Sequence, residues 1–168
     1  MSLIASLALL LLQATAPAPV QERQQEGGNI MGPYVGVQER PGPLRFCGGH
    51  VAIDVAGDEQ IAWQEGPDFD LYFLRSSRGG FGLYQGMHPD TYQSTREQVR
   101  VGDRSAERLR DSDGHYSYLI QIGDASFPTY IHLYGRVWQG DARDDALLAR
   151  VRIGEPAALG CERPTFRR

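Results

Sequence analysis

Short segments in which apolar and polar residues alternate are the feature that most limits what this chain can fold into. Residues 50–55 show the pattern, because Val51, Ile53 and Val55 point one way in an extended chain while His50 and Asp54 point the other. Similar segments follow at 69–75, 81–87, 98–101, 107–110, 115–122 and 129–139. A period of two is typical of strands with one buried face, so the sequence predicts a β-rich fold.

The connections between these segments are short and rich in Gly, Asp and Pro, which favours antiparallel pairing of neighbouring strands. The clearest turn is Asp111-Ser112-Asp113-Gly114, which predicts a hairpin between 107–110 and 115–122. Residues 141–149 carry acidic residues where a helix would begin, and a short strand is expected after them. We therefore expect a mostly-β fold, a small antiparallel barrel or sandwich built as a meander, with one short helix near the C-terminus. An α+β fold stays open as the alternative.

The N-terminus begins with an uncharged apolar run from Leu3 to Leu12 that is followed by small residues. About ten apolar residues suit the central region of a secretory signal, whereas a bilayer needs roughly twenty. We interpret residues 1–16 as a signal peptide, with the mature N-terminus between Thr15 and Pro19, and expect no membrane span. Residues 17–43, rich in Pro, Gln, Glu and Gly, are expected to form a flexible lead-in, and 44–168 a single globular domain.

Two cysteines, Cys47 and Cys161, lie near the two ends of the expected domain. An exported chain meets oxidising conditions in which a thiol pair persists as a disulfide. The pair has neither the CxxC spacing of a redox site nor the clustered thiolates of a zinc site. The sequence therefore predicts a Cys47–Cys161 disulfide and a periplasmic or secreted location.

Several function classes are disfavoured by the composition. All 17 basic residues are arginine and the net charge is −4, so we expect neither nucleic-acid binding nor the chemistry of a catalytic or phosphate-binding lysine. The sequence has no GxSxG, HExxH or GxGxxG motif, and no cofactor is expected. Asp68 and Asp70 share a strand face, but nothing else points to a metal site. A carboxylate pair for glycoside hydrolysis depends on distances that sequence spacing does not give.

The segment 129–139 holds the candidate binding residues. If it is one continuous strand, one face carries three aromatics, a histidine and an arginine, namely Tyr130, His132, Tyr134, Arg136 and Trp138. Tyr, Trp and Arg supply much of the energy at recognition surfaces. We expect this face to be partly exposed and to bind a partner, with His132 making binding pH-sensitive near its ordinary pKa of about 6.5.

Function follows from these expectations only in outline. The leading hypothesis is an exported non-catalytic domain that binds a protein, peptide or glycan partner in the cell envelope. The alternative is a small periplasmic or secreted hydrolase that uses an acid pair or a histidine. A purely structural envelope component is the third reading. Catalysis is the less favoured class, because no catalytic motif was found.

Overall fold

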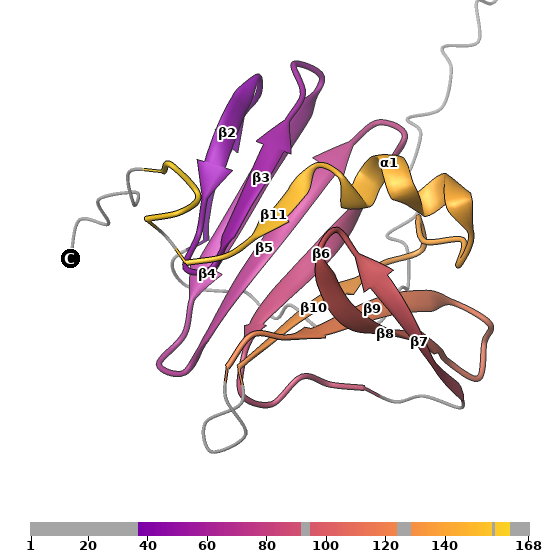
Figure 1. Ribbon diagram of the computed structural model, residues 1–168. Helices are drawn as coiled ribbons and strands as arrows, with labels where there is room; N and C mark the ends of the chain where they lie inside the picture. Colours follow the sequence, from indigo (N-terminus) through magenta and orange to yellow (C-terminus); the bar gives the residue numbers. More distant parts are fainter. Residues whose placement is uncertain (1–36, 92–94, 124–128, 156, 162–168) are drawn as a thin grey trace, which may run out of the picture. The chain divides into compact units, whose positions relative to one another are not determined.

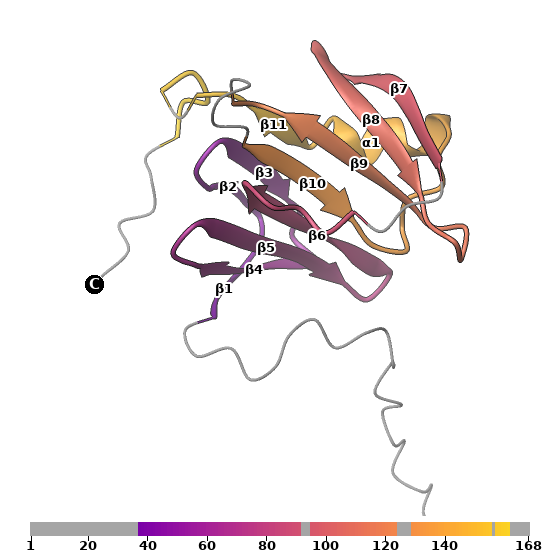
Figure 2. The same cartoon turned by 90° about the horizontal axis from the view of Figure 1, so that it is seen from below.

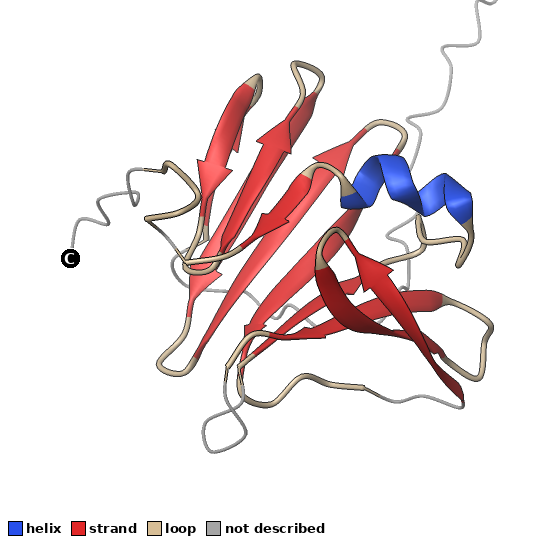
Figure 3. Ribbon diagram, in the orientation of Figure 1, coloured by secondary structure: helices blue, strands red, loops and turns tan. Residues whose placement is uncertain are grey.

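Antiparallel strands dominate the computed structural model, which describes residues 37–91, 95–123, 129–155 and 157–161 (Figures 1 and 3). The larger of two sheets contains β1 (Gln38–Pro41), β4 (Glu59–Glu65), β5 (Phe69–Ser76), β6 (Gly79–Gly86), β7 (Thr95–Val101), β8 (Arg104–Arg110), β9 (Tyr116–Gln121) and β10 (Tyr130–Tyr134). Its strand order is β1-β4-β5-β6-β10-β9-β8-β7, so the meanders β4-β5-β6 and β7-β8-β9-β10 join where β10 pairs with β6, and β1 flanks β4 (Figure 2).

The smaller sheet has the order β11-β3-β2, from β2 (Leu44–Cys47), β3 (Val51–Val55) and β11 (Val151–Ile153). It packs on one face of the larger sheet and encloses the core with it. The Phe46 ring lies 5.0 Å from the Trp63 ring and 5.6 Å from the Tyr72 ring, between centroids. Ile53, Ile61, Leu83, Ile120, Ile131 and Leu133 are fully buried in this core.

The turn between β2 and β3 is attached to the larger sheet by two buried side chains. Tyr72 Oη accepts a hydrogen bond from the Gly49 N–H (3.1 Å), and Gln85 Oε1 accepts one from the His50 N–H (2.7 Å). A Cβ atom at Gly48 would lie 2.4 Å from Cζ of Tyr72, so the turn approaches the sheet only because glycine has no side chain.

An ion pair connects the two sheets at another point. The guanidinium of Arg150, which directly precedes β11, donates to both carboxylate oxygens of Glu59 in β4 and to the backbone oxygen of Asp54 in β3. Glu59 Oε2 also accepts from the Ala56 N–H (2.8 Å). The β3–β4 connection and the residue before β11 are therefore joined at one carboxylate.

Two short helices, η1 (Ala142–Asp144) and α1 (Asp145–Leu148), lead from β10 towards β11. Asp144, only 1% exposed, accepts hydrogen bonds from Tyr118 Oη (2.6 Å), the Gln139 N–H (2.8 Å) and the Gly140 N–H (2.8 Å). Burial and the neighbouring carboxylate raise the pKa of Tyr118, so its hydroxyl stays a donor. This carboxylate fixes the loop that carries the chain from the larger sheet to the helix.

Cys47 and Cys161 form the predicted disulfide, with Cα atoms 5.8 Å apart. The mostly-β antiparallel fold, the meander and the short helix near the C-terminus are likewise confirmed. The strand order of the larger sheet begins at β1 and ends at β7, so within the described ranges the sandwich, not the closed barrel, applies. The hairpin turn at Asp111 is also confirmed, since its Oδ1 accepts from the Asp113 and His115 N–H groups.

Some boundaries differ from the expectation. The sheet begins at Gln38, inside the segment 17–43 that was expected to be a flexible lead-in, because β1 pairs along β4. An edge position tolerates Pro41 in this strand. β4 was not expected at all, and β10 ends at Tyr134, five residues before 139. The expected signal peptide lies outside the described residues, and in the part that is described no helix has the length and apolar character to cross a membrane.

Candidate functional site

β10 places its alternate side chains on opposite faces of the larger sheet. Ile131 and Leu133 are fully buried in the core beneath the smaller sheet. Tyr130, His132 and Tyr134 therefore lie on the opposite face, which we call the outer face. Three of the five residues expected to share one face do so.

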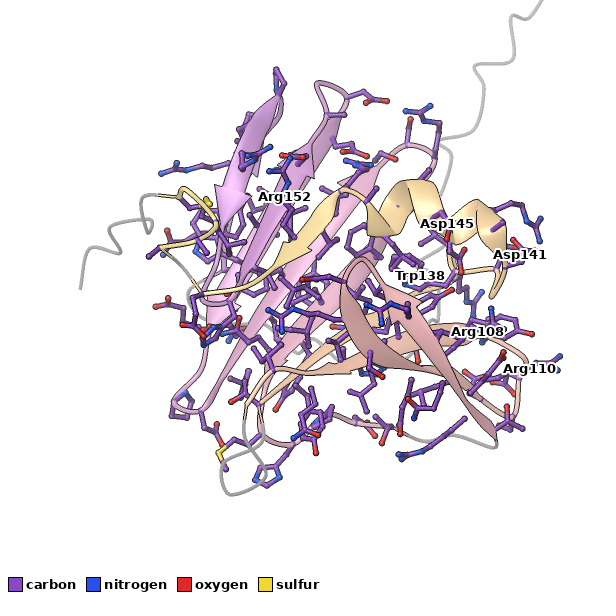
Figure 4. The ribbon with its side chains drawn as sticks, in the orientation of Figure 1. Arg108, Arg110, Trp138, Asp141, Asp145 and Arg152 are labelled. Carbon is purple, nitrogen blue, oxygen red and sulfur yellow. A yellow bond between two sulfur atoms is a disulfide. The ribbon has the colours of Figure 1, made fainter. Side chains whose placement is uncertain are left out.

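The other two expected residues do not join that face. β10 ends at Tyr134 and the next residue, Gly135, has a φ of +130°, so the chain changes direction and the alternation stops. Trp138 is 3% exposed and packs into the core, with its ring 5.2 Å from Phe81 and 5.4 Å from Tyr118 (Figure 4). The expected exposure of Trp138 is wrong, and Arg136 is exposed outside the strand.

Strand pairing extends the outer face on both sides of β10. His132 lies opposite Tyr84 of β6 and opposite Leu119 of β9, and Leu119 in turn lies opposite Glu107 of β8. Residues directly opposite each other on one face contact through their side chains. The outer face therefore has an aromatic part over β5, β6 and β10 and a polar part over β7 and β8. The aromatic part consists of Phe69, Tyr84, Tyr130 and Tyr134.

The aromatic part depends on glycines of β6. A Cβ at Gly82 would lie 2.3 Å from Cζ of Tyr134, and one at Gly86 would lie 2.4 Å from the hydroxyl of Tyr84. The rings therefore lie over the backbone of β6 in the space that side chains would fill. Phe69 stacks on Tyr84 with 6.1 Å between ring centroids, so these aromatics are half-buried by the sheet and by one another.

Among the three candidate binding residues that share the outer face, His132 is the most enclosed, at 8% exposure. Burial lowers its pKa to about 4, so the imidazole is neutral at neutral pH. Its Nε2 atom has no hydrogen-bond partner among the described residues, and its ring lies 5.5 Å from the ring of Tyr134. The expected pH dependence near 6.5 is therefore wrong for this histidine, because the neighbouring apolar surface disfavours its charged form.

A groove of about 620 Å³ lies next to the aromatic part and shares Tyr130 with it. The segment after β6 contributes Met87, His88, Pro89 and Thr91 to this groove. Strands β7 to β10 contribute Arg96, Gln98, Ser105, Ala106, Glu107, Leu119, Gln121 and Tyr130. We call these twelve residues the outer groove. Concave sites of this size are where proteins commonly bind ligands.

The polar side chains that β7 and β8 contribute to the outer groove are joined to one another. Glu107 accepts from the guanidinium of Arg96 (2.9 Å, Nη1 to Oε2) and from the amide of Gln98 (3.3 Å, Nε2 to Oε1). Ser105 Oγ donates to Gln98 Oε1 at 3.4 Å. The single carboxylate of the groove is paired with its single guanidinium, so the groove has balanced charge.

A second pocket, of about 440 Å³, lies between the β7–β8 turn and the segment from α1 to β11. Arg100, Arg104 and Arg152 line it together with Asp103 and Asp145. Arg104 Nε donates to the backbone oxygen of Ile153 (3.3 Å), and Arg100 donates to that of Asp103 (2.6 Å). Two of its three guanidinium groups are thus engaged in holding the fold.

The metal site considered at Asp68 and Asp70 has no counterpart in the described ranges. No group of three or more His, Cys, Asp or Glu side chains there is arranged to hold a metal ion. Asp70, one of the two carboxylates noted in the sequence, accepts a hydrogen bond from Gln85 Nε2 at 3.2 Å. It belongs to the contacts that anchor the β2–β3 turn.

Sequence reasoning missed most of the outer groove. Its residues come from four strands and a connecting segment, and only the pairing register brings them together. One signal was present in the sequence. Alternate positions of β6 are Gly80, Gly82, Tyr84 and Gly86, a pattern that indicates a face on which neighbouring rings lie close to the backbone.

Comparison with known proteins gives no further guidance, since no protein family, curated protein or solved structure matches this chain.

Proposed function

We propose that this chain is an exported, non-catalytic domain that binds a protein, peptide or glycan partner of the cell envelope in the outer groove and on the adjoining aromatic part of the outer face. One observation carries the proposal. Met87, at 39%, is the one large hydrophobic residue exposed within the described ranges, and it lines the same groove as Tyr130. A concave surface that places apolar side chains beside a few polar ones is typical of a ligand site.

The contacts of Glu107 support a binding role. Its carboxylate accepts from the guanidinium of Arg96 and the amide of Gln98, and the two hydrogen bonds hold it in one orientation. The same contacts make Glu107 a well-oriented acceptor for a ligand.

Export is supported by two independent features of the chain. The disulfide between Cys47 and Cys161 is of the kind that persists in oxidising compartments. The apolar run from Leu3 to Leu12 has the length of a signal-peptide core. Fractionation of cells that express the full chain, followed by intact-mass measurement, tests export directly. An N-terminus between Thr15 and Pro19 in the exported fraction supports it, and recovery of the chain with residues 1–14 still attached contradicts it.

Binding is tested with peptide and glycan arrays probed by the purified mature protein, followed by calorimetry on the positive ligands. Tyr130→Ala and Met87→Ser should each weaken binding at least tenfold. Arg136→Ala is the matched control, because Arg136 is exposed beside β10 but does not line the groove. Ligands that bind the two groove variants as tightly as the native chain would contradict the proposed site. Hydrolysis of a bound ligand would replace the proposal with the hydrolase alternative.

A further inference from the structure

We infer that the ligand of the outer groove is a neutral oligosaccharide, an inference that rests on the proposed binding function and names its ligand class. Three properties of the groove lead to it: its polar majority, its balanced charge and its position on the face of the sheet.

The chemical make-up of the groove disfavours a lipid or another wholly apolar ligand. Seven of its twelve residues have polar side chains, and the other five are Met87, Pro89, Ala106, Leu119 and Tyr130. Sites for small apolar molecules are lined mainly by hydrophobic and aromatic groups. A sugar ring matches the mixture better, because it has an apolar C–H face and a rim of hydroxyl groups.

The charge of the groove disfavours an anionic ligand. Its one arginine, Arg96, is paired with its one carboxylate, Glu107, so no guanidinium is left in the groove to neutralise a phosphate, sulfate or uronate. Recognition of such groups relies on arginine forks or clusters. An uncharged ligand does not need a free guanidinium, so the paired state of Arg96 does not oppose its binding.

The position of the groove disfavours an extended peptide. The groove lies across the face of β7 to β10. Of these strands β8, β9 and β10 are paired on both sides, so their backbone groups are already used by the sheet, and β7 alone is an edge strand. A peptide gains most of its affinity by adding a strand at a free edge. On this face its amides would have to pair with side chains alone, whereas a sugar hydroxyl can donate and accept freely.

The two ends of the groove provide what a sugar needs at adjacent positions. Tyr130 lies directly opposite Gln121 across β9 and β10, so the Cβ atoms of the two residues are about 5 Å apart on one face. The ring can stack on the C–H face of one sugar unit while the amide of Gln121, whose Nε2 donates to the Gly123 backbone oxygen, offers its oxygen to the sugar hydroxyls. At the other end Gln98 and Glu107 form a second planar pair. With a volume of about 620 Å³, the groove suits a ligand the size of a di- or trisaccharide.

Calorimetry and NMR titration of the purified mature protein with a panel of uncharged hexasaccharides (β-1,4-glucan, α-1,4-glucan, β-1,4-mannan, β-1,4-xylan and chitin fragments) test this inference. At least one should bind, with a Kd that stays within twofold between 50 and 500 mM NaCl, as expected for an uncharged ligand. Tyr130→Ala and Gln121→Ala should each weaken binding at least tenfold. Tyr130→Phe should retain most of it if the ring stacks, and Arg136→Ala should have no effect.

Gln121 is exposed, so its substitution leaves the fold intact and keeps the test valid if Tyr130→Ala proves unstable. If the panel fails while a peptide binds and loses affinity on Tyr130→Ala, the oligosaccharide inference is overturned and the proposed function stands. If only sulfated or uronate-containing oligosaccharides bind, with a steep salt dependence, the inference is likewise overturned. Failure of every glycan and every peptide would overturn both.

Discussion

Asp144 shows how one buried carboxylate can decide the geometry of a loop. Replacing it with alanine leaves the buried Tyr118 hydroxyl and the partly buried N–H groups of Gln139 and Gly140 without their acceptor. We expect Asp144→Ala to lower the free energy of unfolding by about 3 kcal/mol or more, since each unsatisfied buried group costs roughly 1–3 kcal/mol. Urea unfolding followed by the fluorescence of the tryptophans measures the loss.

Asp145→Ala is the control for Asp144. Asp145 is the next residue but is exposed, so its loss should change the stability by no more than about 0.5 kcal/mol. Equal losses in the two variants would mean that the Asp144 network does not support the loop.

Glu59 makes stability depend on pH. Burial raises the pKa of its carboxyl, but the Arg150 guanidinium and the Ala56 N–H outweigh burial, and the net pKa is lowered below its ordinary value of 4.5. Because the folded-state pKa is depressed, the stabilisation is fully present above about pH 4.5 and is lost as the pH falls through the folded-state pKa. Melting temperatures between pH 7 and pH 3 should therefore fall at the acid end.

Glu59→Gln should lower the melting temperature at pH 7 and should show a smaller decrease than the native chain between pH 5 and pH 3. Glu155→Gln is the matched control, because the Glu155 side chain is 78% exposed and its contact with His50 is long, at 3.7 Å. Its acid profile should run parallel to that of the native chain. Parallel profiles for Glu59→Gln would show that this carboxylate is not a source of the acid lability.

At the level of single residues, alternation placed Tyr130, His132 and Tyr134 on one face correctly, because each lies within the regular part of a strand. It failed at Trp138, because alternation holds only while the backbone stays extended, and the extended segment ends at Gly135. The lowered pKa of His132 could not be predicted from the sequence, because it depends on side chains from β6 and β9 that enclose the ring.

Among the elements, the β2–β3 turn is the one whose position depends most on glycine. Gly48→Ala would place a Cβ within 2.6 Å of three atoms of Tyr72, whose hydroxyl accepts from the Gly49 N–H. We expect Gly48→Ala to lower the free energy of unfolding by about 1–3 kcal/mol, as for other overpacked interiors. Thermal unfolding measures it.

Gly57→Ala tests whether the stability lost in Gly48→Ala comes from steric crowding or from replacing a glycine as such. The nearest atom to a Cβ there is Cδ of Pro43 at an ordinary 3.8 Å, so the stability should change little. A loss at Gly57 as large as that at Gly48 would contradict the steric explanation.

Most strands with clear alternation were predicted, whereas β4 was missed for a physical reason. Ile61, Ala62 and Trp63 are all buried, so this strand has apolar residues on both faces and shows no alternation. Three consecutive apolar residues fit a buried strand, a helix or a loop equally well. Its identity depends on β5, which pairs with it over seven positions.

For the whole molecule, hairpins between sequence neighbours could be expected, but the β6–β10 pairing could not. It joins segments more than forty residues apart and creates the outer groove by bringing β10 between β6 and β9. The division into two sheets was also hidden, because it requires β11 to return to β3. Long-range pairing leaves no trace in local periodicity.

The disulfide should contribute to the stability of the whole domain. It links residues 114 positions apart, and on the chain-entropy model such a link raises the free energy of unfolding by about 4–5 kcal/mol. The double variant Cys47→Ser/Cys161→Ser should melt about 15 °C below the oxidised native chain. Calorimetry measures the difference, and the reduced native chain should match the variant. A melting temperature unchanged in the double variant would rule out this contribution.

The same bond makes the backbone from β3 to β11 part of one covalent ring. A protease that cleaves a single peptide bond in any exposed turn of that ring, such as the one at Gly102 or at Gly114, opens the ring without releasing a fragment. Both halves stay tethered at Cys47 and Cys161, so they can re-pair without having to meet by diffusion. In a compartment rich in proteases, one cut turns this domain into two disulfide-linked chains that together still carry all of its strands.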